Sequence, residues 1–161
     1  MIVVTGTAPR CGTSAMMREL LKEYKPHTYA QDFPDYVARE KNPEGFWDMN
    51  KKYLFGDDPI PYEEDSVIKL WSPHFNRAPV QDVKLLIIMQ RENFLDQMKS
   101  MHSCAIAEGY SSVEPHHLSM MFKNQKTGID ETFSETPQIR VMMETLREDP
   151  ESVISSIKEI I

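Results

Sequence analysis

Cysteine is scarce in this chain of 161 residues, since only Cys11 and Cys104 occur, far apart and without metal-like spacing. A disulfide framework is therefore not expected, and a reducing compartment is the default. Long hydrophobic runs are also absent, because no apolar segment approaches the roughly 20 residues that span a membrane. The first residues enter a strand-like segment at once, which leaves no room for a signal peptide. These absences predict a cytoplasmic protein with no membrane partner.

A surplus of positive charge is lacking as well. The formal net charge is −7, which argues against a broad nucleic-acid-binding surface. It does not exclude a small basic pocket for an anionic ligand, because a binding site is local and net charge is not. With 40% hydrophobic residues and no internal repeat, the sequence predicts one globular domain over residues 1–161.

Short apolar runs alternate with helical patterns along the chain. The strand candidates are Ile2–Val4, Val67–Trp71, Lys84–Met89 and Ile139–Met143. Apolar spacing predicts helices over roughly residues 13–25, from Phe94 to a stop at Gly109, and from Pro150 with Asp149 as N-cap. Short helices are also possible around residues 34–41 and after Trp47. This alternation predicts an α/β fold of three layers, with a mostly parallel central sheet flanked by helices.

The segment 5–14 joins the first strand candidate to the first helix candidate. A strand–loop–helix turn directs unpaired backbone N–H groups and the positive end of the helix dipole at one spot. Gly12 lets the backbone approach an anion closely, and Thr13 and Ser14 can add hydroxyl donors. Arg10 adds a permanent cation with a forked donor geometry suited to phosphate or sulfate. The loop is therefore a predicted anion site.

A Walker A lysine and a Walker B aspartate are both missing. Gly6 and Gly12 enclose five residues rather than four, and Thr13 occupies the place of the lysine. The third strand candidate runs into Gln90 and Arg91 instead of an aspartate. Magnesium-dependent hydrolysis of ATP or GTP is thereby disfavoured, although a divergent P-loop kinase or NTPase stays an alternative.

The segment Pro9-Arg10-Cys11-Gly12-Thr13-Ser14 resembles the donor loop of sulfotransferases that use PAPS, 3′-phosphoadenosine 5′-phosphosulfate. In that family Cys11 is usually serine. The resemblance implies a P-loop-type fold in which residues 10–14 bind the 5′-phosphosulfate through backbone amides and hydroxyls. It also implies that Arg10 steadies charge on the transferring sulfuryl group. Cys11 has no evident partner base, so a role in loop packing is favoured over one as nucleophile.

A second sulfotransferase signature places an arginine before a helix that begins with N-P-x-D and carries a serine one turn later. It is similar to the segment from Arg91 to Ser100, where Asn93, Asp96 and Ser100 keep the family spacing. The resemblance implies that Arg91 and Ser100 bind the donor's 3′-phosphate. Arg91 lies one residue early, and one extra residue, Glu92, predicts a bulge or a widened turn there. The alternative is a surface arginine followed by an amphipathic helix.

Sulfuryl transfer needs a base for the acceptor's proton and cations for the leaving phosphate. The segment 42–48 resembles one in bacterial and phage sulfotransferase-like proteins that ends in a carboxylate, which makes Asp48 the first candidate base, with a helix cap as the alternative. Lys69 follows apolar residues in a segment similar to the family's V-I-K strand, and by resemblance it approaches the bridging oxygen or the sulfuryl group. His74 could replace Asp48, but a solvated loop histidine is favoured.

The segment 140–153 resembles the family's closing strand, its turn at Asp149 and Pro150, and its last helix. His116 and His117 have no further ligands nearby in sequence, so a solvated turn is expected there and no metal. The sequence thus predicts an enzyme that moves a sulfuryl group from PAPS to a hydroxyl or amine of an unknown small-molecule, glycan or protein acceptor. The alternatives are the divergent kinase and a non-catalytic nucleotide-binding protein. The oligomeric state stays open.

Overall fold

The computed structural model describes residues 1–27, 59–107 and 114–161. In chain order they form β1 (Ile2–Gly6), α1 (Thr13–Leu20), β2 (Lys25–Pro26), β3 (Ser66–Lys69), the 3₁₀ helices η1 (Ser72–Arg77) and η2 (Val80–Asp82), β4 (Leu85–Gln90), α4 (Phe94–Ala107), α5 (Pro115–Thr132), β5 (Gln138–Met142), α6 (Met143–Glu148) and α7 (Pro150–Ile160). The predicted α/β fold is confirmed, and all four predicted strands are present within two residues at each end.

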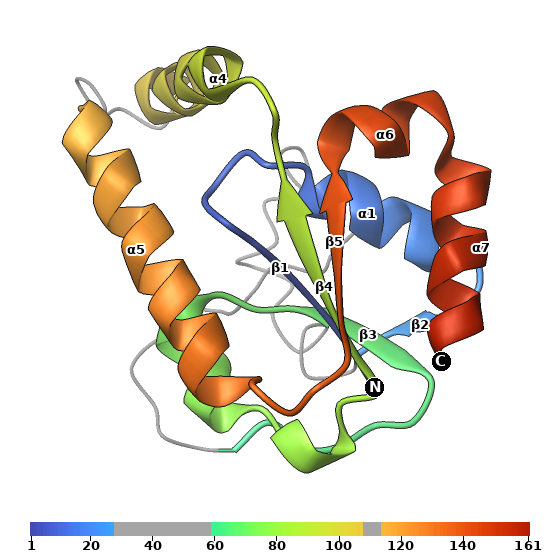
Figure 1. The fold of residues 1–161 in the computed structure, drawn as a ribbon. Helices are drawn as coiled ribbons and strands as arrows, with labels where there is room; N and C mark the ends of the chain where they lie inside the picture. Colours follow the sequence, from blue (N-terminus) through green and yellow to red (C-terminus); the bar gives the residue numbers. More distant parts are fainter. Residues whose placement is uncertain (28–58, 108–113) are drawn as a thin grey trace.

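A parallel sheet forms the centre of the molecule, with the described strands in the order β2-β3-β1-β4-β5 (Figure 1). Both β1 and residues 85–89 of β4 are buried along their whole length, as expected of parallel strands covered on both faces. The chain leaves β1 towards β2 and leaves β4 towards β5. The carboxyl ends of β1 and β4 therefore flank the crevice in which open α/β sheets bind ligands.

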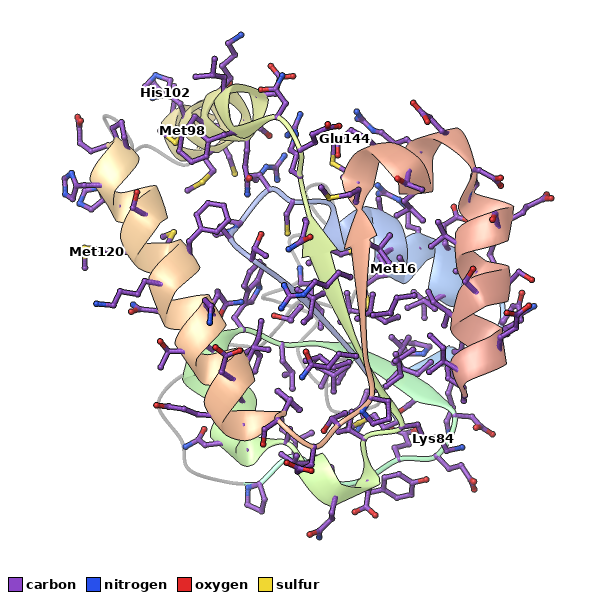
Figure 2. The ribbon with its side chains drawn as sticks, in the orientation of Figure 1. Met16, Lys84, Met98, His102, Met120 and Glu144 are labelled. Carbon is purple, nitrogen blue, oxygen red and sulfur yellow. The ribbon has the colours of Figure 1, made fainter. Side chains whose placement is uncertain are left out.

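Helices cover both faces of the sheet and complete the three layers (Figure 1). On one face α1, α6 and α7 pack against the sheet, and the core there includes Ile157 and Met16. Met16 projects from α1 (Figure 2). On the other face α5 and η1 pack against the sheet, where the rings of Phe75 and Phe133 meet edge to face with centroids 5.1 Å apart. None of the described helices is long and apolar enough to cross a membrane.

Two helix starts follow from local sequence. The carboxylate of Asp149 accepts a hydrogen bond from the backbone N–H of Ser152 at 3.0 Å, just before Pro150 opens α7, so the predicted cap is confirmed. The side-chain oxygen of Asn93 likewise accepts from the N–H of Asp96 at 3.1 Å at the start of α4.

The helices differ from the prediction at three places. The first helix ends at Leu20 rather than near residue 25, because residues 21–23 form a turn that brings Lys25 and Pro26 into pairing with β3. The segment around His116 and His117 is the first turn of α5 and not a loop, although both side chains are exposed as expected. Helix α6 was not predicted. Gly109, residues 34–41 and the segment after Trp47 lie outside the described residues.

The apolar face predicted for α4 is only partly buried. Met101 is buried, but Phe94, Leu95 and Ile106 are exposed. The side of α4 that faces the rest of the protein carries Gln97 instead, which is 1% exposed. This helix is therefore attached through polar contacts as much as through apolar ones.

Candidate functional site

The loop between β1 and α1 lies at the carboxyl end of the central strand. The N–H of Thr7 donates to the carbonyl of Met89 at 3.0 Å, which ties the start of the loop to β4. Gly12 precedes α1 with a φ of 100°, and a Cβ there would lie 2.6 Å from Cγ of Met143, so only glycine fits. No described side chain caps α1 and its first turn has no acidic residue, so the N-terminal N–H groups suit an anion.

Arg10 lies exposed at the turn of this loop. Its φ of 67° is in the left-handed region, which side-chain-bearing residues rarely adopt. Its Nε donates to Oγ of Ser100 on α4 at 3.0 Å, across 90 positions of sequence. The predicted donor loop and the predicted 3′-phosphate serine are therefore in direct contact.

Cys11 is fully buried beneath the loop. A Cβ added to Gly6 would lie 2.1 Å from the Cys11 sulfur, which shows how tightly the thiol packs against the end of β1. Burial raises the pKa of the Cys11 thiol from 9.0 to about 11, and backbone hydrogen bonds and the charge of Lys69 offset this only in part. A thiol that stays protonated at neutral pH is a poor nucleophile. The structure thus agrees with the packing role.

Arg91 follows β4 and reaches the loop. Its Nη1 donates to the carbonyl of Arg10 at 3.5 Å, and its Nε lies 3.9 Å from Oε1 of Glu144 in α6. Glu144 lies at the start of α6, on the side of α4 (Figure 2). The Nε of Arg91 is buried and has no hydrogen-bond partner in the described part of the chain. The N–H of Glu92 donates to the other carboxylate oxygen of Glu144 at 3.2 Å. β4 stays regularly paired with β5 through Gln90, so the strand itself has no bulge before Arg91.

Helix α4 is fastened to the loop by one face. Nε2 of Gln97 donates to the carbonyl of Pro9 at 2.7 Å, and Ser100, three residues later, accepts from Arg10. Met101 packs against Ala8 on the same side. The position of α4 therefore depends on the conformation of the loop.

The remaining predicted residues are placed differently. Lys69 ends β3 beside Val4 of β1, is 5% exposed, and lies close enough to Cys11 to influence its ionisation. His74 is also 5% exposed, so the expectation of a solvated histidine is wrong: η1 packs between the sheet and α5 and carries the ring inward. Asp48, with the rest of segment 42–48, lies outside the described residues.

Two pockets flank Arg91. One of about 640 Å³ lies on the α5 side and includes Thr7 of the loop. The other, of about 610 Å³, lies towards α6 and includes Glu144 and Arg147. Arg91 lines both, so this side chain separates two spaces large enough for small molecules.

Gln125 on α5 holds the end of β1, where the donor loop begins. This residue was not identified from the sequence. Its Nε2 donates to the carbonyl of Gly6 at 2.8 Å and to Oγ1 of Thr5 at 3.1 Å. Its Oε1 accepts from the N–H of Ser72 at 2.6 Å. The signal available in the sequence was a lone amide at a position where helical spacing places an apolar residue. Gln97 and Glu144 were also missed, and their roles depend on contacts that no local pattern reveals.

Among the described ranges, no group of three or more His, Cys, Asp or Glu side chains could hold a metal ion. Comparisons of the chain with protein-family models, with curated proteins and with solved structures find no match. We therefore infer the function from the residues and the geometry of the site.

Proposed function

We propose that this chain is a PAPS-dependent sulfotransferase that transfers a sulfuryl group to a hydroxyl or amine of an acceptor. The observation that supports this most directly is the meeting of two distant segments, each resembling a donor-binding signature. Arg91 contacts the loop at Arg10 across 81 positions, and Arg10 contacts Ser100 across 90. A single strand–loop–helix turn binds phosphate in many folds, whereas the second anchor suits a donor with phosphates at both ends.

The donor loop would hold the 5′-phosphosulfate. The N–H groups that open α1, with the hydroxyls of Thr13 and Ser14, supply donors at the positive end of the helix. Backbone amides of Cys11 and Gly12 complete the set that the family resemblance implies. The permanent charge of Arg10 lies at the rim of this loop, where it can neutralise the transferring group.

Arg91 would bind the 3′-phosphate together with Ser100. A buried guanidinium N–H without a hydrogen-bond acceptor is unfavourable and calls for a partner. A phosphate would supply charged oxygens to this group, and charge-assisted bonds of this kind are among the strongest in proteins. Glu144 holds the guanidinium in place at 3.9 Å while leaving this hydrogen bond unmade.

Transfer breaks the bond between sulfur and the bridging oxygen of PAPS and forms one between sulfur and the acceptor atom. The acceptor gives its proton to a base, and 3′,5′-ADP (PAP) leaves with the electron pair of the broken bond. Arg10 and Lys69 supply the positive charge that magnesium supplies in kinases. Asp48 stays the first candidate base and His74 the second. Cys11 and Cys104 are not joined in a disulfide, which is compatible with the cytoplasmic setting that we infer.

Calorimetric titration with PAP, beside ADP and ATP with and without magnesium, tests this proposal. We expect metal-independent binding of PAP that weakens about tenfold or more in both Arg10→Ala and Arg91→Ala, since each loses a charged hydrogen bond. Arg18→Ala, an exposed arginine in the last turn of α1, is the matched control and should bind PAP normally. Magnesium-dependent ATP binding without preference for PAP would overturn the proposal and favour the kinase. PAP binding without turnover across an acceptor panel would favour a non-catalytic protein.

A further inference from the structure

The pocket on the α5 side of Arg91 has the size and the position of a second ligand site. Its volume of about 640 Å³ lies within the range of small-molecule sites, roughly 300–1,000 Å³. Thr7 of the donor loop and Arg91 form part of its wall, so the pocket is continuous with the proposed donor site. Gln90 at the end of β4 and Glu92 just after it also line the pocket, and the rest of the wall comes from α5 and β5.

The charges around this pocket are not balanced. Four basic side chains line it, against the acidic side chains of Glu92 and Asp130. Among the basic ones, Lys126 is paired with Asp130, and Arg91 lies near Glu144. The other two, Lys123 and Arg140, form no ion pair within residues 1–27, 59–107 and 114–161. Only Glu92 opposes these two cations on the wall, so the cavity keeps a surplus of positive charge in a chain of net charge −7, and this surplus attracts an anion locally.

Apolar side chains complete the wall. Phe122 and Ile129 of α5 and Met142 at the end of β5 contribute apolar surface to the pocket. Met142 is 37% exposed, although it lies at the end of a strand. An aromatic ring beside a flexible thioether suits an aromatic or aliphatic group of variable shape. The pocket therefore combines an anion-attracting side with an apolar side.

We propose that this pocket binds the acceptor, and that the acceptor carries an acidic group on an apolar or aromatic body. Lys123 and Arg140 bind the acidic group, and Phe122 and Met142 contact the body. The hydroxyl or amine that receives the sulfuryl group then points towards Thr7 and the donor loop. The acceptor role rests on the proposed function, whereas binding of an organic anion rests on the pocket alone.

Fluorescence titration with 8-anilinonaphthalene-1-sulfonate tests the anion pocket, with N-phenyl-1-naphthylamine as the uncharged probe of the same ring system. We expect one sulfonate probe per chain and binding of the uncharged probe about tenfold weaker, because it cannot form a charge-assisted bond. The double variant Lys123→Ala and Arg140→Ala should lose about tenfold or more in affinity for the sulfonate. Equal binding of the two probes, or unchanged binding by the double variant, would overturn the proposal.

Matched controls locate the signal. Lys99→Ala and Lys158→Ala remove exposed lysines elsewhere, and Leu95→Ser removes an exposed apolar side chain of α4. All three should bind the sulfonate probe as the unaltered chain does. A loss of fluorescence in Leu95→Ser would show that the probe binds the outer side of α4, which overturns the assignment. Urea midpoints of every variant show whether a loss of binding reflects unfolding.

A competition experiment separates this inference from the proposed function. If the pocket takes the acceptor, a chain saturated with PAP still binds the sulfonate probe. Displacement of the probe by PAP would mean that the pocket is the nucleotide site, which overturns the acceptor role. Charge-dependent probe binding in a chain that does not bind PAP would support the anion pocket and overturn the proposed function.

Discussion

Helices α4 and α5 are consecutive among the described elements and both reach the carboxyl end of the sheet, but they are attached differently (Figure 1). Helix α5 buries Gln125 and Ile129 against the sheet and packs on η1. Helix α4 exposes Phe94 and Leu95 and is held to the donor loop through Gln97. The difference indicates that α5 belongs to the core, whereas α4 follows the loop and therefore depends on what the loop binds.

The largest effect expected from this comparison concerns two phenylalanines. Phe133, just after α5, is fully buried against Phe75, so Phe133→Ala should lower the free energy of unfolding by about 3–5 kcal/mol. Phe94 on α4 is 43% exposed, and Phe94→Ala should change the free energy of unfolding by about 0.5 kcal/mol or less. Urea unfolding measures both. If both variants lost a similar amount of unfolding free energy, the proposed difference between α4 and α5 would be wrong.

The second effect concerns the two cysteines and pH. Because the Cys11 pKa is raised from 9.0 to about 11 in the folded state, the folded chain keeps a proton that the unfolded chain releases as pH rises through 9. The stabilisation is fully present below pH 9 and is lost as pH approaches 11, by about 2–3 kcal/mol. Unfolding measured from pH 8 to 11 should show this slope.

Cys104 on α4 is the control for this pH effect. Cys11→Ala should remove most of the decrease in the free energy of unfolding between pH 9 and 11. Cys104→Ala should leave this decrease in place. At pH 8 a thiol reagent should label the partly exposed Cys104 before the buried Cys11. Labelling of both at the same rate in the folded chain would contradict the burial of Cys11.

The two buried amides give the third effect. Gln125→Leu leaves the carbonyl of Gly6 and the N–H of Ser72 without this partner, and should destabilise the chain by about 1–3 kcal/mol. Gln97→Leu removes one bond, to Pro9, and should destabilise by about 1 kcal/mol. Calorimetric titration with PAP then compares the two variants. We expect the weaker affinity for PAP in Gln97→Leu, because the bond from Gln97 to Pro9 helps to fix the conformation of the donor loop. The opposite order would show that α5, not α4, responds to the ligand.

The sheet was predictable from the sequence, whereas the attachment of α4 and α5 was not. Strands buried on both faces leave near-continuous apolar runs, such as residues 85–89, that no other element produces as clearly. Helix α5 was missed because Gln125 and Gly128 interrupt its apolar stripe. Gly128 is needed there, since a Cβ would lie 2.9 Å from Cβ of Ser72. A close approach of this kind is decided by the neighbouring element, and local sequence does not encode it.

Of the candidate site, local sequence predicted only the anion-binding loop between β1 and α1. Glycine, hydroxyl and arginine at a helix entrance predict an anion loop from local physics, and the family resemblance added Arg91 and Ser100. The contacts that hold these parts together join Pro9 to Gln97 across 88 positions and Glu92 to Glu144 across 52. Such pairings are set by strand order and helix placement, which a single sequence does not specify in detail.

The smallest effect is a change in dynamics without a change in stability. Hydrogen exchange should be faster in α4 than in the middle of α5, because Ile129 of α5 packs in the large core beside the sheet, whereas Met101 of α4 packs in a small cluster with Ala8 of the loop. PAP should slow exchange in α4 several-fold and leave α5 unchanged, since the ligand orders the loop to which Gln97 and Ser100 are bound. If PAP slowed hydrogen exchange equally in both helices, the ligand would stabilise the whole protein and α4 would not respond separately.

The backbone of Arg10 has a consequence for protein design. At a φ of 67°, an arginine is about 1 kcal/mol less favourable than glycine would be. A redesign that selects for melting temperature alone would therefore replace Arg10 with glycine or asparagine. The product would be a more stable protein whose loop lacks the guanidinium group. Screening variants for melting temperature would select against the residue that we propose neutralises the transferring group. Stability and activity would have to be scored together to retain it.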